Sequence, residues 1–272
     1  MFAPSALPGA AKPVYYTLRV AVAMCFIGHG AFGIITKAVW CNYFAVFGID
    51  AVTAYKLMPL VGTVDILMGI SMLVYPTRAI ALWLVIWGLF TASLRPASGE
   101  PFAEMIERAG NYGAPLALLL LCGMQAKFKT WFTFIQPPGN VAFNIKSTVG
   151  ICLRVAAFLL LSGHGWLNLL HKKTLIGQYT GLGFQQANTV ATVAGITEIV
   201  AAILILIRPS RGLLFAFLIW KIGTELLYPN HLLFEWVERG GSYGTLLALW
   251  FICAPAITAQ NKAGQAVLKP VG

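Results

Sequence analysis

An internal repeat is the feature that most constrains how this chain folds. The octapeptide I-E-R-A-G-N-Y-G at 106–113 stands before the apolar run A-P-L-A-L, and V-E-R-G-G-S-Y-G at 237–244 stands before L-L-A-L-W. The triplet G-H-G at 28–30 likewise recurs at 163–165. Further matched pairs are Arg19/Arg154, Asp65/Glu198, Pro76/Pro209, Arg78/Arg211, Trp87/Trp220, Pro96/Pro229 and Cys122/Cys253. This pattern predicts a fold made of two equivalent halves.

The composition indicates that the repeated segments lie in a membrane. Of the 272 residues, 58% are hydrophobic and 10% are charged, whereas about a quarter of a typical soluble chain is charged. The net charge of +10 comes from bases scattered between apolar segments, which the positive-inside bias explains better than nucleic-acid binding does. The five cysteines include no C-x-x-C pair, which argues against thiol–disulfide exchange by this chain alone.

Hydropathy and helix breakers predict an all-α, polytopic membrane fold with eight transmembrane helices. Each half has an even number of spans, so the repeats are expected to be parallel and to form two four-helix bundles side by side. The expected modules are residues 1–126 and 149–272, joined by an interfacial linker at 127–148. The spans are expected near 14–36, 56–75, 78–95, 104–124, 149–170, 188–207, 211–227 and 238–258.

Charge sets the expected orientation. The side that carries both termini holds many bases and no acid, while the loop acids, such as Asp50, Glu100 and Glu235, belong to the other side. We therefore expect a multi-pass protein of the inner (plasma) membrane with both termini in the cytoplasm. The first twenty residues hold no compact apolar run followed by a cleavage site, so insertion is expected to use the first span.

The repeated ionisable residues are the candidate site, because a charge within hydrocarbon is costly and usually faces the interior of a bundle. Their positions predict that the outer half of each bundle gathers one His and two carboxylates. The arginine and the tyrosine of each octapeptide are four residues apart and therefore share one helix face, so they are expected to line the same space. The candidate site residues are His29, Asp65, Glu107, Arg108 and Tyr112 in the first bundle, and His164, Glu198, Glu238, Arg239 and Tyr243 in the second.

Two interpretations of these residues remain open at this point. Each Glu-Arg pair can be a buried lock between helices, with its glycines forming a packing face, or it can line a pocket. Imidazole and carboxylate suit iron or manganese, but the spacing lacks the Glu-x-x-His motif of di-iron bundles, so no metal ligand is assigned. A His–carboxylate hydrogen bond, structural or for proton transfer, is the preferred interpretation. Lys221 and Glu225 occur only in the second half, which favours that half as the working one.

Each half resembles the DoxX-like family, which includes DoxD, the small membrane subunit of thiosulfate:quinone oxidoreductase. The residues that carry the resemblance are the Arg opening the first span, the G-H-G stretch, the acid of the second span followed by Arg78 or Arg211, and a polar-led fourth span. The resemblance covers nearly the whole chain, although two fused modules depart from the usual single module. It implies a membrane subunit of a quinone-linked oxidoreductase, with quinone as the cofactor and redox subunits as partners.

The expected function is therefore that of an integral membrane subunit of a quinone-linked oxidoreductase system. A quinone site needs aromatic or aliphatic walls and a proton donor at each carbonyl, which Trp87, Trp220, the two tyrosines and the His–carboxylate pairs can supply. A transporter for a small solute or ion is an alternative from another class. A structural subunit that packs against a larger membrane complex is the third.

Overall fold

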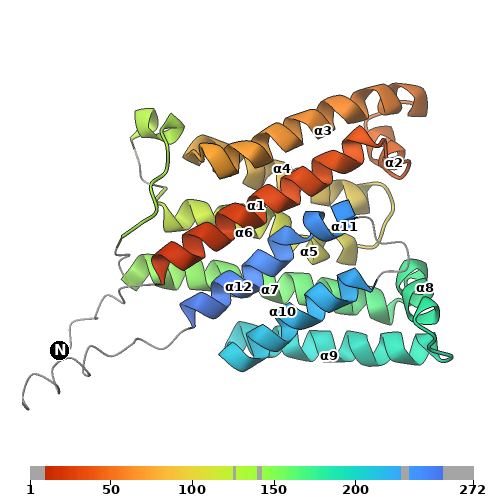
Figure 1. Ribbon diagram of the computed structural model, residues 1–272. Coiled ribbons are helices and arrows are strands. Elements are labelled where there is room, and N and C mark those ends of the chain that lie inside the picture. The colour runs from red at the N-terminus through yellow and green to blue at the C-terminus, as the bar shows by residue number, and fades with distance from the viewer. Residues whose placement is uncertain (1–9, 125–126, 140–142, 228–232, 254–272) are drawn as a thin grey trace, which may run out of the picture.

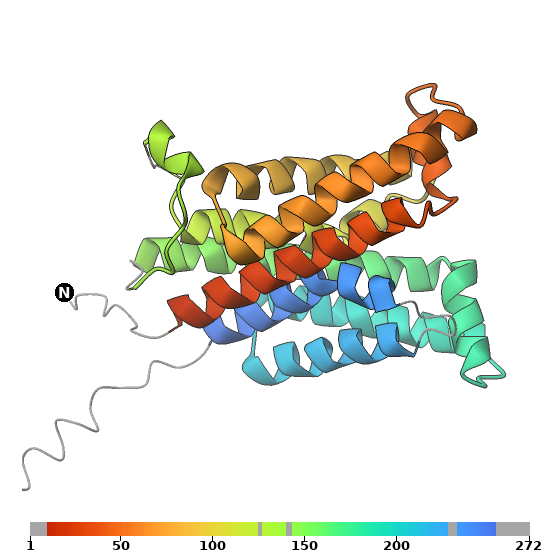
Figure 2. The same cartoon turned by 45° about the horizontal axis from the view of Figure 1, so that its top comes forward.

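The computed structural model describes residues 10–124, 127–139, 143–227 and 233–253 (Figure 1). Over these residues the chain is all-α, as the sequence predicts, and contains no strand. The long helices run side by side (Figures 1 and 2). The elements of the first half are α1 (Ala11–Ile34), α2 (Trp40–Ala45), α3 (Ala51–Val74), α4 (Arg78–Ala97), α5 (Ala103–Glu107) and α6 (Ala109–Leu121). A 3-10 turn, η1 (Phe128–Phe132), precedes α7 (Phe143–Leu169), α8 (Lys173–Gly181), α9 (Ala187–Ile207), α10 (Arg211–Leu226), α11 (Leu233–Glu238) and α12 (Gly240–Ile252).

Five of the described helices are long and apolar enough to cross a membrane, namely α1, α3, α4, α7 and α9. Helices α6 and α12 are apolar but shorter. Helices α3, α4, α9 and α10 expose large apolar side chains, such as Leu67, Ile86, Ile203 and Phe215, while Asp65 and Glu198 are almost completely buried. Apolar groups outside and charges inside are the arrangement expected of a helical membrane protein.

Local sequence explains where three of these helices begin. Asp50, Thr77 and Ser210 each accept a hydrogen bond from the backbone N–H three residues later, which caps α3, α4 and α10. Such caps satisfy one of the free N–H groups at a helix start. Thr77 and Ser210 follow the matched Pro76 and Pro209, so the same short turn joins the second and third long helices in both halves.

The expected fourth span is two helices in each half. Helix α5 ends at Glu107 and α6 begins at Ala109, because Arg108 leaves helical geometry with ψ of 17°. Helices α11 and α12 are divided in the same way at Arg239, whose ψ is 2°. The break therefore falls within the repeated octapeptide, at its arginine, so the Glu-Arg pair lies at the junction of two helices.

The fourth segments pack against the first helix of the opposite half, which corrects the expectation of two separate bundles (Figure 2). Helices α11 and α12 lie against α1, and α5 and α6 lie against α7. A Cβ at Gly28 would overlap the backbone of Glu238, and a Cβ at Gly163 would overlap that of Glu107. One apolar core joins the halves, with Leu18 and Val22 of α1 in the same cluster as Leu153 and Leu160 of α7.

The two octapeptides meet each other at the centre of the molecule. A Cβ at Gly110 would lie 2.6 Å from the backbone of Gly241, and a Cβ at Gly241 would lie 2.7 Å from that of Gly110. Only glycine allows two helix backbones to approach this closely. Equivalent residues of the two copies therefore face one another, which explains why both copies carry glycine at the fifth position.

The segment at 127–148 differs in part from the expected interfacial linker. Helix α7 already begins at Phe143, six residues before the expected boundary. Ahead of it, Ile135 is buried, donates its backbone N–H to Pro76 and accepts a hydrogen bond from the Tyr15 hydroxyl. Phe128 and Phe132 of η1 are exposed. The segment thus combines an exposed aromatic turn with an anchor on the first half.

Candidate functional site

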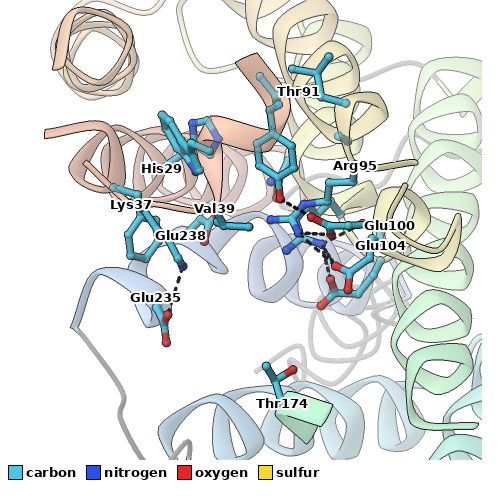
Figure 3. Close-up of a pocket in the computed structure, with 18 of the residues that line it drawn as sticks. His29, Lys37, Val39, Thr91, Arg95, Glu100, Glu104, Thr174, Glu235 and Glu238 are labelled. Carbon is cyan, nitrogen blue, oxygen red and sulfur yellow. Dashed lines mark hydrogen bonds and ion pairs between the residues drawn. The ribbon is translucent and has the colours of Figure 1, made fainter. Parts of the chain in front are cut away.

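A cavity of about 690 Å³ lies between the two halves, at the end of the bundle opposite the start of α1. Its walls come from α1 to α6 of the first half and from α7, α8, α10 and α11 of the second (Figure 3). One side is aromatic, lined by Phe32, Trp40, Tyr43, Phe44, Phe47, Trp87 and Phe90. The remainder carries most of the acids in the chain together with the bases that neutralise them.

His29 belongs to a hydrogen-bonded group on the first-half side of this cavity. Its Nδ1 lies 2.7 Å from Asp65 Oδ2, and the other oxygen of Asp65 accepts a hydrogen bond of 2.7 Å from the indole N–H of Trp87. The imidazole packs on Trp40, with ring centroids 4.7 Å apart. Both oxygens of a buried carboxylate are thereby satisfied, and the bond at Nδ1 leaves Nε2 as the nitrogen available to the cavity.

The second half holds an equivalent group around His164. Its Nδ1 lies 2.7 Å from Glu198 Oε2, and Trp220 donates its indole N–H to Glu198 Oε1 at 2.7 Å. Here the side chain of Asn168 adds a bond of 3.2 Å to Glu198, and Tyr179 donates to Asn168 at 2.8 Å. Burial raises the pKa of Tyr179 to about 12, so its hydroxyl remains a donor at neutral pH.

Glu107 does not join His29 and Asp65 as the sequence analysis expects. Because α5 packs on α7, its backbone lies beside Gly163, next to His164 of the other half. Its carboxylate accepts from Arg239 at 2.7 Å and from Arg108 at 2.8 Å. Glu238 is displaced in the same way, since its backbone lies against Gly28 and its side chain lines the cavity near His29 (Figure 3). The fourth segments are therefore exchanged between the two His groups.

A chain of ion pairs extends from Glu107 across the cavity wall. Arg108 also contacts Glu104 at 2.8 Å, Glu104 contacts Arg95 at 3.3 Å, and Arg95 contacts Glu100 at 2.8 Å. On the other side, Arg239 reaches Glu225, which pairs with Lys221 at 3.3 Å. Buried charges need such partners, because an isolated ion in a low-dielectric interior is strongly unfavourable.

Three ion pairs at the cavity join a residue of the first half to a residue of the second. They are Glu107–Arg239, Glu104–Lys172 and Lys37–Glu235. The first two involve almost fully buried carboxylates, whereas the Lys37–Glu235 pair is about one-third exposed on both sides. The cavity wall is thus a charged seam between the two copies of the repeat.

The site also contains five residues that were not predicted from the sequence, namely Glu104, Arg95, Glu100, Lys172 and Tyr43. Tyr43 donates to Glu100 at 2.7 Å, and burial raises the pKa of its phenol. One signal for Glu104 was available, because it lies four residues before Arg108 and this spacing favours an ion pair on a helix. Arg95, Glu100 and Tyr43 are not repeated, so a search for matched residues passes over them, whereas Lys172 is matched by Lys37 at the spacing that relates the two histidines.

Four candidate residues lie away from the cavity surface. Tyr112 and Tyr243 pack in the core, and Tyr243 has its ring 5.6 Å from that of Trp236. Asp65 and Glu198 lie behind the two His rings. The residues from the sequence analysis that line the cavity are His29, Glu107, Arg108, His164, Glu238 and Arg239. The two tyrosines therefore do not line this cavity.

Among the described residues, no group of three or more His, Cys, Asp or Glu side chains has the proximity needed to share a metal ion. No protein-family model, curated protein or solved structure matches this chain.

Proposed function

We propose that this chain is an integral membrane subunit of a quinone-linked oxidoreductase system and that the cavity between its halves takes the quinone ring. The observation that carries the proposal is the His29–Asp65 pair, which opens onto a cavity with an aromatic wall. A mostly apolar pocket with a few well-placed polar groups is typical of small-molecule sites. The resemblance to the DoxX-like family points to the same chemistry.

The residues of the cavity are suited to transfer the protons that quinone reduction requires. Reduction of a quinone to a quinol takes up two electrons and two protons, and the electrons come from a partner subunit that carries a redox centre. His29 holds a proton at Nδ1 against Asp65 and presents Nε2 to the cavity. The carboxylate stabilises the charged imidazole, so this ring is suited to deliver a proton and to regain one.

We further propose that the chain crosses the membrane eight times as two parallel repeats, with α5–α6 and α11–α12 as the fourth crossings. The Pro-containing turns, η1 and the start of α1 gather at the basic end, which favours cytoplasmic termini (Figure 1). Fusing either terminus to a reporter active only in the cytoplasm tests this, and we expect signal from both fusions. Silent fusions that become active when placed after Gly48 or Gly99 would contradict the orientation.

Quinone binding is the direct test of the proposed function. Titration of the purified protein in mild detergent with a short-chain benzoquinone is expected to give saturable quenching of tryptophan fluorescence, because Trp40 and Trp87 line the cavity. Trp40→Leu should weaken the binding, whereas Trp83→Leu should not, since Trp83 is half-exposed and lies outside the lining. Quenching without saturation, or the same loss in both variants, would contradict the proposal.

The transport alternative makes a different demand on the molecule. The apolar core that includes Val14, Leu18 and Leu153 lies between the cavity and the basic end, so a transported solute would require this core to open. Solute uptake by reconstituted vesicles that is lost in Glu107→Gln would favour transport over quinone chemistry.

A further inference from the structure

The two His–carboxylate groups face one cavity, but their surroundings differ. We infer that His29 is the group that contacts the ligand and exchanges the proton, and that His164 is held as a structural member of the second half. The ligand class is a planar, uncharged ring that carries a carbonyl oxygen. This inference rests on the proposed function and states that the first half of the chain carries the reacting histidine.

The first argument is the additional bonding around His164. Asn168 bonds to Glu198 and Tyr179 bonds to Asn168, so the ring is fixed by a chain of buried polar groups. Gly33 occupies the position equivalent to Asn168 in the first half, counted by the same spacing that relates the two histidines. No side chain is therefore present there to clamp His29. The exposed fractions agree, at 18% for the side chain of His29 and 8% for that of His164.

The second argument comes from α2 and α8, which follow the first long helix of each half. Helix α2 contributes Trp40, Tyr43 and Phe44 to the cavity, and its Trp40 packs on His29. Helix α8 contributes Thr174, Leu175 and Gln178. Gln178 donates to the backbone carbonyl of Thr224 at 2.6 Å, which ties α8 to α10. Among the described residues that line the cavity, the aromatic side chains thus lie on the His29 side, and aromatic faces prefer to pack on a planar ring.

The third argument is the charge balance near the aromatic wall. Arg95 is neutralised by Glu100 and Glu104, and Lys37 is paired with Glu235 (Figure 3). The groups of the adjoining elements that face His29 are Asp65 on α3, Arg95 on α4 and Glu238 on α11. The bases of the described residues at this wall are already paired, so an anionic ligand finds no free cation among them. An uncharged ring with a hydrogen-bonding oxygen fits better.

The proton step follows from this placement. A redox centre in a partner subunit supplies two electrons, and the ring takes up two protons. The Nε2–H bond of the charged His29 breaks and an O–H bond forms on the nearer carbonyl oxygen, while the farther carbonyl oxygen takes its proton from water in the cavity. Asp65 keeps the proton at Nδ1 and acts as a positioning residue. His29 regains its Nε2 proton from water through the open side of the cavity.

Chemical labelling tests the asymmetry without any quinone. Brief treatment of the folded protein with diethyl pyrocarbonate, followed by peptide mass spectrometry, should modify His29 several-fold faster than His164. Asn168→Ala removes the clamp and should raise the labelling rate of His164 toward that of His29. Equal rates in the unaltered protein, or faster labelling of His164, would overturn the inference.

Binding of a short-chain benzoquinone then tests the role of each His. His29→Gln should weaken affinity by about tenfold, the loss of one hydrogen bond to a charged donor, and should abolish the pH dependence of binding. His164→Gln should lower thermal stability and leave the pH dependence of binding unchanged. The reverse pattern would overturn the inference. If the unaltered protein binds no quinone although His29 is labelled first, the proposed function fails and the asymmetry stands.

Discussion

At the residue scale, the most informative groups are the two buried carboxylates. Asp65 and Glu198 each accept one hydrogen bond from a tryptophan indole and one from a histidine. Four bonds of 2.7 Å in equivalent positions explain why an acid, a His and a Trp recur together in both halves. A buried carboxylate without these donors would be left with an uncompensated desolvation cost.

Removing one indole donor should therefore destabilise the protein. Trp87→Phe keeps the apolar ring but leaves one oxygen of Asp65 without its donor, so we expect a loss of about 1.5–3 kcal/mol in unfolding free energy. The measurement is reversible unfolding in detergent. Trp83→Phe is the matched control, because Trp83 stacks on Trp87 with centroids 6.0 Å apart and is half-exposed. Similar losses in the two variants would show that packing, not the hydrogen bond, is responsible.

A pH effect is expected at the start of α3. Hydrogen bonds from the hydroxyl and backbone N–H of Thr53 lower the pKa of Asp50 below its ordinary value of 3.8. A lowered folded-state pKa stabilises the protein above the ordinary value, and this contribution is lost as the pH falls below it. Thermal unfolding should thus show Asp50→Asn less stable at neutral pH, with the difference narrowing toward about pH 3. A difference that widens on acidification would contradict this.

The repeat identifies part of the site from sequence alone. His29, Asp65 and their second-half equivalents are predictable, because an ionisable residue within an apolar segment is costly and the repeat singles it out. Arg95 is not predictable in this way, because it occurs in one half only. Lys172 is matched by Lys37 at the spacing that relates the two histidines, but its contact with Glu104 joins residues far apart in sequence. Their assignment needs the packing of α5 against α7.

At the element scale, long apolar helices are readily predicted and short ones are not. The expected second and third spans of each half coincide with the helices α3, α4, α9 and α10, of which α10 is shorter than a candidate span. They coincide because Pro76 and Pro209 end one helix and a Thr or Ser cap begins the next. Helices α2 and α8 are too short to give a clear periodic signal, yet they build much of the cavity. The breaks at Arg108 and Arg239 also leave no trace in hydropathy.

The glycine contact between α6 and α12 gives a prediction at this scale. Gly110→Ala places a Cβ 2.6 Å from the backbone of Gly241 and Ser242, so the helices must separate. We expect a loss of about 1–3 kcal/mol in unfolding free energy, the usual cost of overpacking. Gly223→Ala is the control, because a Cβ at this helical position meets no atom within 4 Å and should be neutral or stabilising. Equal tolerance of both changes would contradict the close approach.

At the scale of the whole molecule, the two copies of the repeat share one core and one cavity. A repeat in sequence admits two packings, one in which the fourth segment folds onto its own half and one in which the segments are exchanged. Local patterns are the same in both, since Gly28 and Gly163 provide the same gap for either octapeptide. Sequence reasoning accordingly predicts the contact type but not the partner. The structure has the exchanged arrangement, with Glu238 at Gly28 and Glu107 at Gly163.

The most direct test of this arrangement is a double-mutant cycle on the Glu107–Arg239 pair, which joins the halves at 2.7 Å. The free energies of unfolding of Glu107→Gln, Arg239→Gln and the double variant are measured together, with the partly exposed Lys37–Glu235 pair as the control cycle. If the two halves are joined by this buried ion pair, the coupling energy should be on the order of 1–3 kcal/mol for Glu107–Arg239 and below about 1 kcal/mol for the control. Additive effects of Glu107→Gln and Arg239→Gln, within about 0.5 kcal/mol, would contradict it.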